Sequence, residues 1–140
     1  ARYDLIGLPV KEEWGLIAKK GVLPAKTIPK EALGDLPLIM GRRSIVRDQV
    51  AETIGLDPTQ LKVRVTVNLP MATKQLALTG HYFHLGIRGV FDQFHDSRLT
   101  FIPLTPAVTS GHLLATKKHR SLSPAAAAFL TFLRTAARID

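Results

Sequence analysis

The sequence contains no cysteine, and aromatic residues make up only 6% of its 140 residues. Without cysteine the chain cannot hold a disulfide framework, a zinc-ribbon site or a thiol nucleophile. No uninterrupted apolar run approaches the about 20 residues that cross a bilayer, and no secretory signal opens the chain. These absences exclude a disulfide scaffold and a bilayer-spanning helix, and they predict that the membrane is not a partner.

What is present is a hydrophobic fraction of 46% and a formal net charge of +8. This length and composition suit one compact domain or two small lobes with a real core. The basic residues are dispersed, and no basic stripe is interleaved with aromatic residues, as a stacking surface for single strands would need. The charge therefore predicts a solvated surface rather than nucleic-acid binding. The small basic clusters are Lys19–Lys20, Arg42–Arg43 and Lys117–Arg120.

Short apolar strands alternate with helical segments along most of the chain. Such alternation predicts an α/β fold with a mostly parallel sheet and helices on both faces. Ligands of such sheets bind at the carboxyl ends of the strands. Expected strands are 14–19, 37–40, 61–67, 82–87, 99–104 and 112–116, and expected helices are 29–33, 43–54, 71–78, 89–94 and one that begins at Ser123–Pro124.

Two of these strand ends lead directly into helices and form candidate anion sites. One passes through Met40–Ser44 and the other through Val67–Ala72. A helix start offers free backbone N–H groups and the positive end of the helix dipole. Arg42 or Arg43 adds a guanidinium that can bind a carboxylate. The alternative interpretation is ordinary helix capping beside two surface arginines.

Motifs of catalysis and metal binding are absent or weak. The chain has no GxGxxG, P-loop, HExxH or GxSxG sequence. His81 and His84 fall on opposite faces of an expected strand, so they are not expected to bind one metal ion together. The nearby His95, Asp92 and Asp96 do not alter this expectation. The adjacent carboxylates Glu12 and Glu13 are interpreted as a solvated pair. We therefore expect neither an enzyme nor a metal or other cofactor.

Several segments, in this order, resemble the effector-binding region of LysR-type transcriptional regulators. The first is Tyr3–Lys20, which reads YDLIGLPVKEEWGLIAKK. The last is a lysine-containing strand, Leu114–Lys118, followed by a Ser-Pro-Ala helix at Ser121–Leu130. Between them lie the matching segments Leu33–Ile39, Val67–Leu69 and Leu99–Leu104.

The resemblance implies two lobes similar to periplasmic binding proteins. Residues 1–13 would cross from lobe I to lobe II, and residues 14–102 would be lobe II, with a mixed, mostly parallel sheet flanked by helices. Residues 103–111 would cross back, and residues 112–140 would be the C-terminal strand and helix of lobe I. The chain starts without Met and almost without a polar lead-in, so we expect a fragment of a longer protein.

The resemblance also implies a function and partners. A small, plausibly anionic effector would bind in the cleft between the lobes and modulate DNA binding by a cytoplasmic homodimer or larger homo-oligomer. DNA would be bound only through a missing N-terminal helix-turn-helix. The alternative is a solute-binding protein of a transport system. The expected ligand contacts are Gly41, Arg42, Ser44, Asn68, Pro70 and Met71.

Two further expectations concern departures from the family. The family often has a Gly-x-Gly turn where this chain reads Gly80-His-Tyr-Phe-His84. The lost second glycine is expected to change the local cleft wall and the ligand it accepts. The final helix carries an apolar face with Phe129, Leu130 and Leu133 whose usual partner is missing, so we expect this helix to pack on another copy or to be placed unusually.

Overall fold

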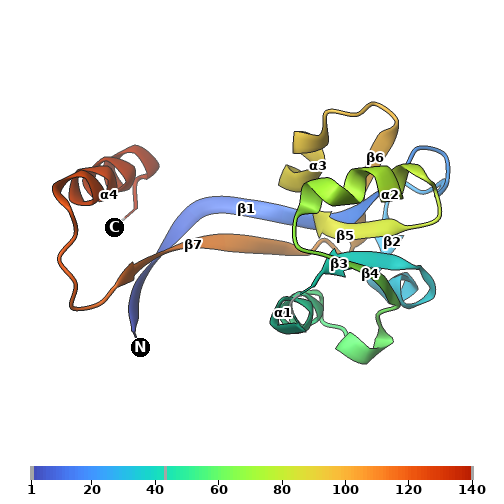
Figure 1. Cartoon of the computed structure of the whole chain (residues 1–140), viewed down its shortest axis with the longest axis horizontal. Helices are drawn as coiled ribbons and strands as arrows, with labels where there is room; N and C mark the ends of the chain where they lie inside the picture. The colour runs from blue at the N-terminus through green and yellow to red at the C-terminus, as the bar shows by residue number, and fades with distance from the viewer. Residues whose placement is uncertain (1, 43, 140) are drawn as a thin grey trace. The chain divides into compact units, whose positions relative to one another are not determined.

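The chain forms two compact units, which are described separately here. The computed structural model describes residues 2–42 and 44–139, without the side chains of residues 44–47. Unit 1 contains residues 1–11 and 111–140, and unit 2 contains residues 12–110. The paired strands β1 (Tyr3–Lys19) and β7 (Thr109–Lys117) each run from one unit into the other (Figure 1).

Unit 2 is built on a mixed sheet with the strand order β2-β6-β1-β5-β3-β4. Strands β5, β3 and β4 are parallel to one another, β2 is parallel to β6, and β1 is antiparallel to β5 and β6. This confirms the predicted α/β fold with a mixed, mostly parallel sheet. The strands are β2 (Ile28–Pro29), β3 (Leu38–Gly41), β4 (Val63–Val67), β5 (Phe83–Ile87) and β6 (Leu99–Thr105). The helices are α1 (Ser44–Ile54), α2 (Thr73–Leu78) and α3 (Arg88–Phe94), and the 3₁₀ turns are η1 (Lys30–Asp35), η2 (Pro58–Gln60) and η3 (Pro70–Ala72).

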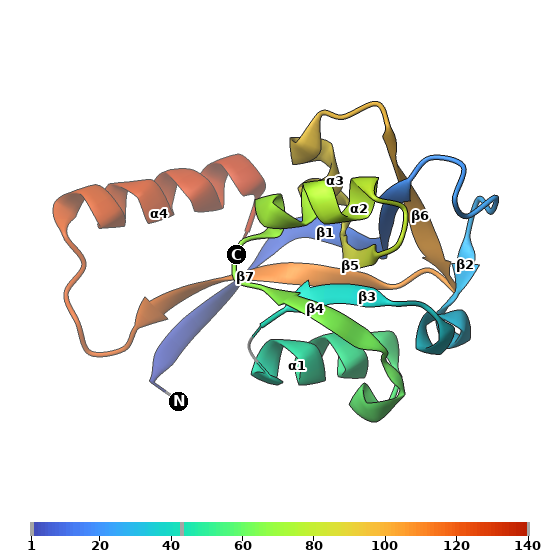
Figure 2. The same cartoon turned by 45° about the vertical axis from the view of Figure 1, so that its right-hand side comes forward.

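Helices cover both faces of this sheet, α1 on one side and α2 with α3 on the other (Figure 2). The buried end of β1 shows why two cores form. Leu16 and Ala18 pack with residues of α1, whereas Ile17 packs with residues of α2 and α3. Successive side chains of a strand point to opposite faces, so this continuous apolar run fills the core on both sides.

One expected helix is a 3₁₀ turn throughout, and another begins as one. The segment expected to be a helix at 29–33 is the 3₁₀ turn η1. Pro29 is extended and pairs with Thr105 instead of starting an α-helix. The segment expected to be a helix at 71–78 begins as η3 before α2.

Several strand boundaries also differ from the expected ones. β1 and β7 are both longer than expected because they pair with each other. β3, β4 and β5 each start one or two residues later than expected, and β6 runs through Pro103 to Thr105, one residue beyond its expected end. At this point Pro103 lies opposite Gly15 of β1. A Cβ on Gly15 would lie 2.5 Å from the carbonyl oxygen of Ile102, so the strands approach closely there.

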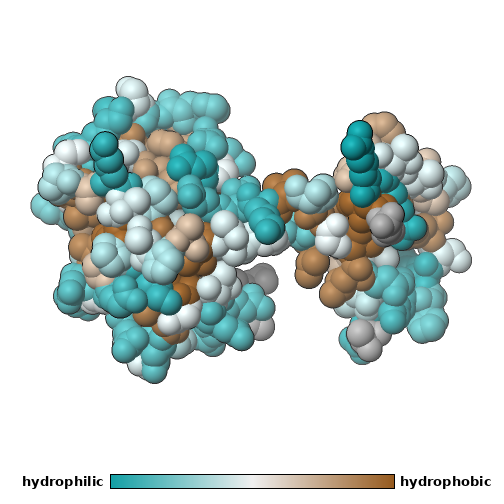
Figure 3. Space-filling model, turned by 180° about the vertical axis from the view of Figure 1, so that it is seen from behind, coloured by the Kyte–Doolittle hydropathy of each residue, from teal (hydrophilic) through white to brown (hydrophobic). Residues whose placement is uncertain are grey.

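Unit 1 consists of the first part of β1, most of β7 and the helix α4 (Pro124–Ala137). The helix begins as predicted, since the Ser123 hydroxyl accepts a hydrogen bond of 3.2 Å from the backbone N–H of Ala126. None of the residues described in this unit is buried, and apolar surface gathers over it (Figure 3). Its exposed large apolar side chains are Tyr3, Leu5, Val10, Leu113, Leu122, Phe129 and Phe132.

Within the described chain, no helix has the length and apolar character needed to cross a lipid bilayer.

Candidate functional site

Three parallel strands of unit 2 end at the same edge of the sheet. The strand β3 ends at Gly41, β4 at Val67 and β5 at Ile87. Gly41 pairs with Val67 in register, so the loops that follow β3 and β4 start side by side. The carboxyl edge of parallel strands is where α/β folds bind ligands, and the loops at this edge form the candidate site.

The loop after β3 is short and leads directly into α1. The backbone N–H of Arg42 donates a hydrogen bond of 2.9 Å to the carbonyl oxygen of Val67. This bond extends the β3–β4 ladder by one residue and holds Arg42 beside the second loop. The Arg42 side chain is exposed. Ser44 is the first residue of α1, but its expected capping side chain lies outside the described part of the structure.

The loop after β4 presents polar and apolar groups together. Asn68, Pro70 and Met71 are all exposed. Leu69, which was not among the expected contacts, is 70% exposed, and Met71 is 52% exposed. Two exposed apolar side chains on a loop that starts next to the arginine-bearing loop suit a ligand with an apolar body and an acidic group. Leu69 lies within the candidate segment Val67–Ala72, but nothing in the sequence distinguishes it from a leucine of the core.

A buried pair of side chains supports this loop from below. The Thr73 hydroxyl, at the start of α2, donates a hydrogen bond of 2.6 Å to the carbonyl oxygen of Pro70. Its oxygen lies 2.9 Å from Nδ1 of His84 on β5. Because the hydroxyl proton is used at Pro70, the ring donates from Nδ1 to the hydroxyl. Burial lowers the pKa of His84 to about 4, so the ring is neutral near pH 7.

The start of α3, after β5, is held by the two acidic residues of β1. Oε2 of Glu12 accepts a hydrogen bond of 3.1 Å from the backbone N–H of Gly89. Oε1 of Glu13 accepts bonds of 3.1 and 2.9 Å from Nε and Nη2 of Arg88. The interpretation of Glu12 and Glu13 as a solvated pair was therefore wrong. Their partners come from a segment more than 70 residues away, and no local pattern reports them.

Gly89 and Arg88 have additional packing roles. A Cβ on Gly89 would lie 2.7 Å from Oε1 of Glu12, so glycine leaves room for that carboxylate. The guanidinium of Arg88 lies 4.4 Å from the ring centroid of Phe101, a cation–π contact. The contacts with Glu13 and Phe101 hold the Arg88 side chain in place. Arg88 is therefore less available to a ligand than Arg42.

The histidines considered as metal ligands are placed differently from one another. His84 lies in β5 and is buried, whereas His81 precedes that strand and is exposed. His95 ends α3 in a left-handed conformation. Asp96 is bound by Arg98 and Lys74 at 2.7 and 3.3 Å, and Arg98 holds the pKa of this carboxyl far below its usual range. In residues 2–42 and 44–139, no three such side chains converge on a possible metal position.

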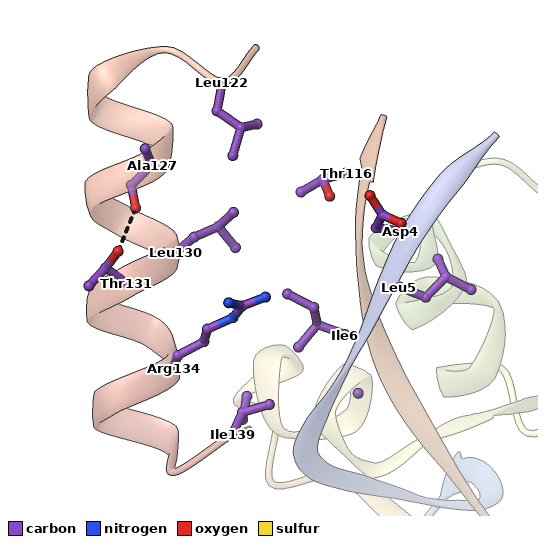
Figure 4. A pocket seen from close by; sticks show the side chains of 11 residues that line it. Asp4, Leu5, Ile6, Thr116, Leu122, Ala127, Leu130, Thr131, Arg134 and Ile139 are labelled. Carbon is purple, nitrogen blue, oxygen red and sulfur yellow. Dashed lines mark hydrogen bonds between the residues drawn. The ribbon is translucent and has the colours of Figure 1, made fainter. Parts of the chain in front are cut away.

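A cavity also lies in unit 1, away from the strand ends. It has a volume of about 670 Å³ between α4 and the two strands. Leu130 and Arg134 of α4 point across it toward Ile6 of β1 (Figure 4). None of its lining residues is buried, so we interpret it as loose packing of a helix against two strands. The edge of unit 2 has the better-supported geometry, because a packed core holds its loops.

An α/β unit with loops gathered at one carboxyl edge belongs to the class of small-molecule-binding folds. The sequence profile of one such family, the LysR substrate binding domain, matches residues 8–138. The chain therefore belongs to the LysR substrate binding domain family, which confirms the resemblance seen in the sequence. No match was found among curated protein sequences.

Solved structures of LysR-family regulators share the fold at low sequence identity. The CcmR regulatory domain of Synechocystis PCC6803, in complex with 2-PG, has a TM-score of 0.74 and 19% identity, and the match covers 97% of this chain and 68% of that one. The effector binding domain of QuiR, in complex with shikimate, has a TM-score of 0.72 and 18% identity, over 98% and 66% of the two chains. Full-length CbnR, complexed with its target DNA, has a TM-score of 0.75 and 14% identity, over 97% and 48%. This chain thus spans about half the length of the full-length regulator.

Proposed function

We propose that this chain is the effector-sensing part of a LysR-type transcriptional regulator. A small anionic molecule binds at the carboxyl edge of unit 2 and modulates how the full-length oligomer binds DNA. Support comes from the family match and from related domains solved with small molecules. The family is one of transcriptional regulators, and this favours a sensor over a transport protein. A regulatory sensor needs no catalytic residues or cofactor, and it acts in the cytoplasm beside the DNA.

The observation that carries the site is the hydrogen bond from Arg42 to Val67 at the end of the β3–β4 ladder. It holds the backbone of Arg42, whose side chain is exposed, beside the start of the loop at Asn68 and at the edge where α1 starts. The proposed contacts are those expected from the sequence, together with Leu69: Gly41, Arg42, Ser44, Asn68, Pro70 and Met71. The arginine and the positive end of α1 select an acidic group, and Leu69 with Met71 selects the apolar part of the ligand.

The proposed lobe assignment keeps the boundaries expected from the sequence. Residues 14–102 form lobe II and residues 112–140 contribute a strand and a helix to lobe I, with crossings at 1–13 and 103–111. The compact unit 12–110 supports this assignment. A calorimetric titration tests the ligand site, with small mono- and dicarboxylic acids compared with their neutral amides. The acids are expected to bind at least about tenfold more tightly, because a charged hydrogen bond contributes about 1.5–3 kcal/mol.

The matched variants are Arg42→Ala at the proposed site and Arg64→Ala, an exposed arginine within β4. Arg42→Ala is expected to remove the preference for acids, while Arg64→Ala retains it. If acids and amides bind equally, or if both variants lose binding equally, the anion site is wrong. A full-length protein whose DNA binding does not respond to a bound acid would contradict the regulatory role.

A further inference from the structure

Positive charge is concentrated in unit 1. This unit has 41 of the 140 residues, yet it carries seven of the nineteen Lys and Arg residues and two of the eleven Asp and Glu residues. Its net charge is therefore +5 of the total +8. The larger unit 2 holds only the remaining +3. The dispersed pattern in the sequence conceals this asymmetry, because unit 1 is assembled from both ends of the chain.

Three of the seven basic residues of unit 1 lie at the end of β7 and in the turn that follows it, residues 117–120. The backbone N–H of Lys118 donates a hydrogen bond of 3.0 Å to the carbonyl oxygen of Arg2, which brings a residue of the chain start to this turn. Nζ of Lys118 lies 3.5 Å from Oδ1 of Asp4, the one acidic residue of unit 1 that the structure describes. His119 takes a left-handed conformation with φ of 57° and reverses the chain.

Two cations of this turn remain without an acidic partner among the residues described. Lys117 and Arg120 are both exposed, and Asp4, the described carboxylate that lies at this turn, is paired with Lys118. They line a shallow hollow of about 380 Å³, and the other lining residues are Asp4, Thr116, His119, Ser121 and Leu122. Guanidinium, ammonium and hydroxyl groups around one hollow are the groups that bind phosphate oxygens.

We propose that the Lys117–Arg120 turn binds the phosphate backbone of duplex DNA without reading its sequence. The turn has no aromatic side chain to stack on bases, so the contact is electrostatic and independent of sequence. Residues 117–121 contain no apolar residue, and Leu122 is the single large apolar side chain given for the hollow. Segments that bind membrane surfaces instead carry a whole apolar face beside their basic groups. The chemistry of the turn therefore favours a nucleic-acid backbone over a lipid surface.

The inference builds on the proposed function, since a regulator's sensor is tethered to the part that holds DNA. A short tether gives an effective concentration in the millimolar range, so a contact with a dissociation constant of about 10⁻⁴ M would be occupied. DNA contact was expected only through a head domain outside this chain. The turn supplies an additional contact from the sensor itself.

Fluorescence anisotropy with a labelled 20-base-pair duplex of arbitrary sequence tests this, using the 140-residue chain at several NaCl concentrations from 50 to 200 mM and no effector. The variant Lys117→Ala/Arg120→Ala removes two phosphate contacts. It is expected to weaken binding at least about tenfold at 50 mM salt. It should also reduce the slope of log K against log salt by about 1.8, which is about 0.9 for each contact. The matched control Lys19→Ala/Lys20→Ala removes two exposed lysines of unit 2 and should change affinity less than threefold.

Equal weakening in the two double variants would mean diffuse charge attraction and would overturn the proposal, as would the absence of duplex binding by the unmodified chain at 1 mM. Anionic phospholipid vesicles provide the other arm, and a turn-dependent affinity higher for vesicles than for the duplex would assign the surface to a membrane instead. Circular dichroism checks folding, and Lys117→Gln/Arg120→Gln replaces the alanine variant if that one unfolds. This experiment contains no effector. A failure of duplex binding would therefore not contradict the proposed effector site, which the calorimetric titration tests separately.

Discussion

The ring of His84 donates a hydrogen bond from Nδ1 to the hydroxyl of Thr73, 2.9 Å away, and that hydroxyl donates in turn to the backbone of the loop after β4. The pair thereby connects β5, α2 and the candidate ligand loop. Thr73 is fully buried and His84 is 6% exposed. Since unsatisfied buried polar groups cost free energy, each member of this chain of hydrogen bonds depends on the other two.

Thr73→Val is expected to lower the free energy of unfolding by about 2–3 kcal/mol. Valine keeps the shape but leaves the Pro70 carbonyl and the His84 N–H without partners in a buried place. Thr73→Ser should lose less, because the hydroxyl remains. Urea unfolding measures both, with Thr79→Val as control. The Thr79 hydroxyl also bonds a helix carbonyl, that of Leu76, but it is exposed to water. A change below about 0.5 kcal/mol for Thr73→Val would contradict this role.

Acid is expected to destabilise unit 2 through His84 between pH 6.5 and about 4. The pKa of His84 is lowered to about 4 by burial, while in the unfolded chain it lies near 6.5. In this window the unfolded chain binds more protons, so stability falls as pH falls, by up to about 3 kcal/mol in total. Denaturant unfolding from pH 7 to 4.5 measures the slope. Carboxylates with lowered pKa values, such as Asp96, begin to contribute only below about pH 5, so the slope between pH 6.5 and 5 reports His84.

His84→Asn should flatten that slope, and the matched variant His81→Asn, at an exposed position, should leave it unchanged. The comparison concerns the slope and not the absolute stability, since asparagine also changes the packing. If His84→Asn retains the full pH dependence, another group is responsible and the assignment of the buried ring is wrong.

Gly89→Ala is expected to destabilise the chain by about 1–3 kcal/mol, the range for overpacking a tight site. The new methyl group would lie 2.7 Å from Oε1 of Glu12. Glu12→Ala removes that carboxylate, so Gly89→Ala should cost much less in the Glu12→Ala background. A double-mutant cycle measured by thermal unfolding gives the coupling energy between the two positions. If the free-energy changes of the two single variants simply add in the double variant, the Glu12 carboxylate and the Gly89 position do not interact, and the prediction is wrong.

Two glycines of the same strand provide a sharper contrast. Gly15→Ala is expected to cost several kcal/mol or prevent folding, because its Cβ would meet both the Ile102 carbonyl at 2.5 Å and the Phe101 ring at 2.6 Å. Gly7→Ala meets nothing within 4 Å and should change stability by less than about 0.5 kcal/mol. Expression level and thermal midpoint report both variants. Equal effects would mean that β1 and β6 lie farther apart than described.

Phe132→Ser is expected to weaken self-association. Phe129 and Phe132 are 56% and 70% exposed on α4, and exposed apolar patches of this kind favour contact between copies. The expectation that the last helix packs on another copy thus stays a prediction, which sedimentation velocity over a range of concentrations tests. Leu69→Ser is the control, since Leu69 is also 70% exposed but lies in unit 2. A monomer at all concentrations before substitution would contradict it.

Local sequence was informative wherever the controlling interaction was also local. The alternation of strands and helices and the helix start at Ser123 could both be predicted. The candidate loops could be located for the same reason, since a strand end followed by a helix start is visible in a few residues. The 3₁₀ turn at Lys30–Asp35 could not, because the pairing of Pro29 with Thr105 competes with the helix.

Partners distant in the chain could be known only from the tertiary structure. In the sequence, Glu12 and Glu13 look like two solvated acids, but the folded sheet brings the start of α3 beside them. In the sequence, His84 is one of several histidines, but in the structure Thr73 of α2 lies against its ring. The positive charge of unit 1 likewise emerges when both ends of the chain meet. By itself the sequence determined the class of fold, the family and the loops of the candidate site, because these depend on periodicity and short motifs. The tertiary structure alone decided which charges are paired and which polar groups are buried, because both depend on contacts that local pattern does not encode.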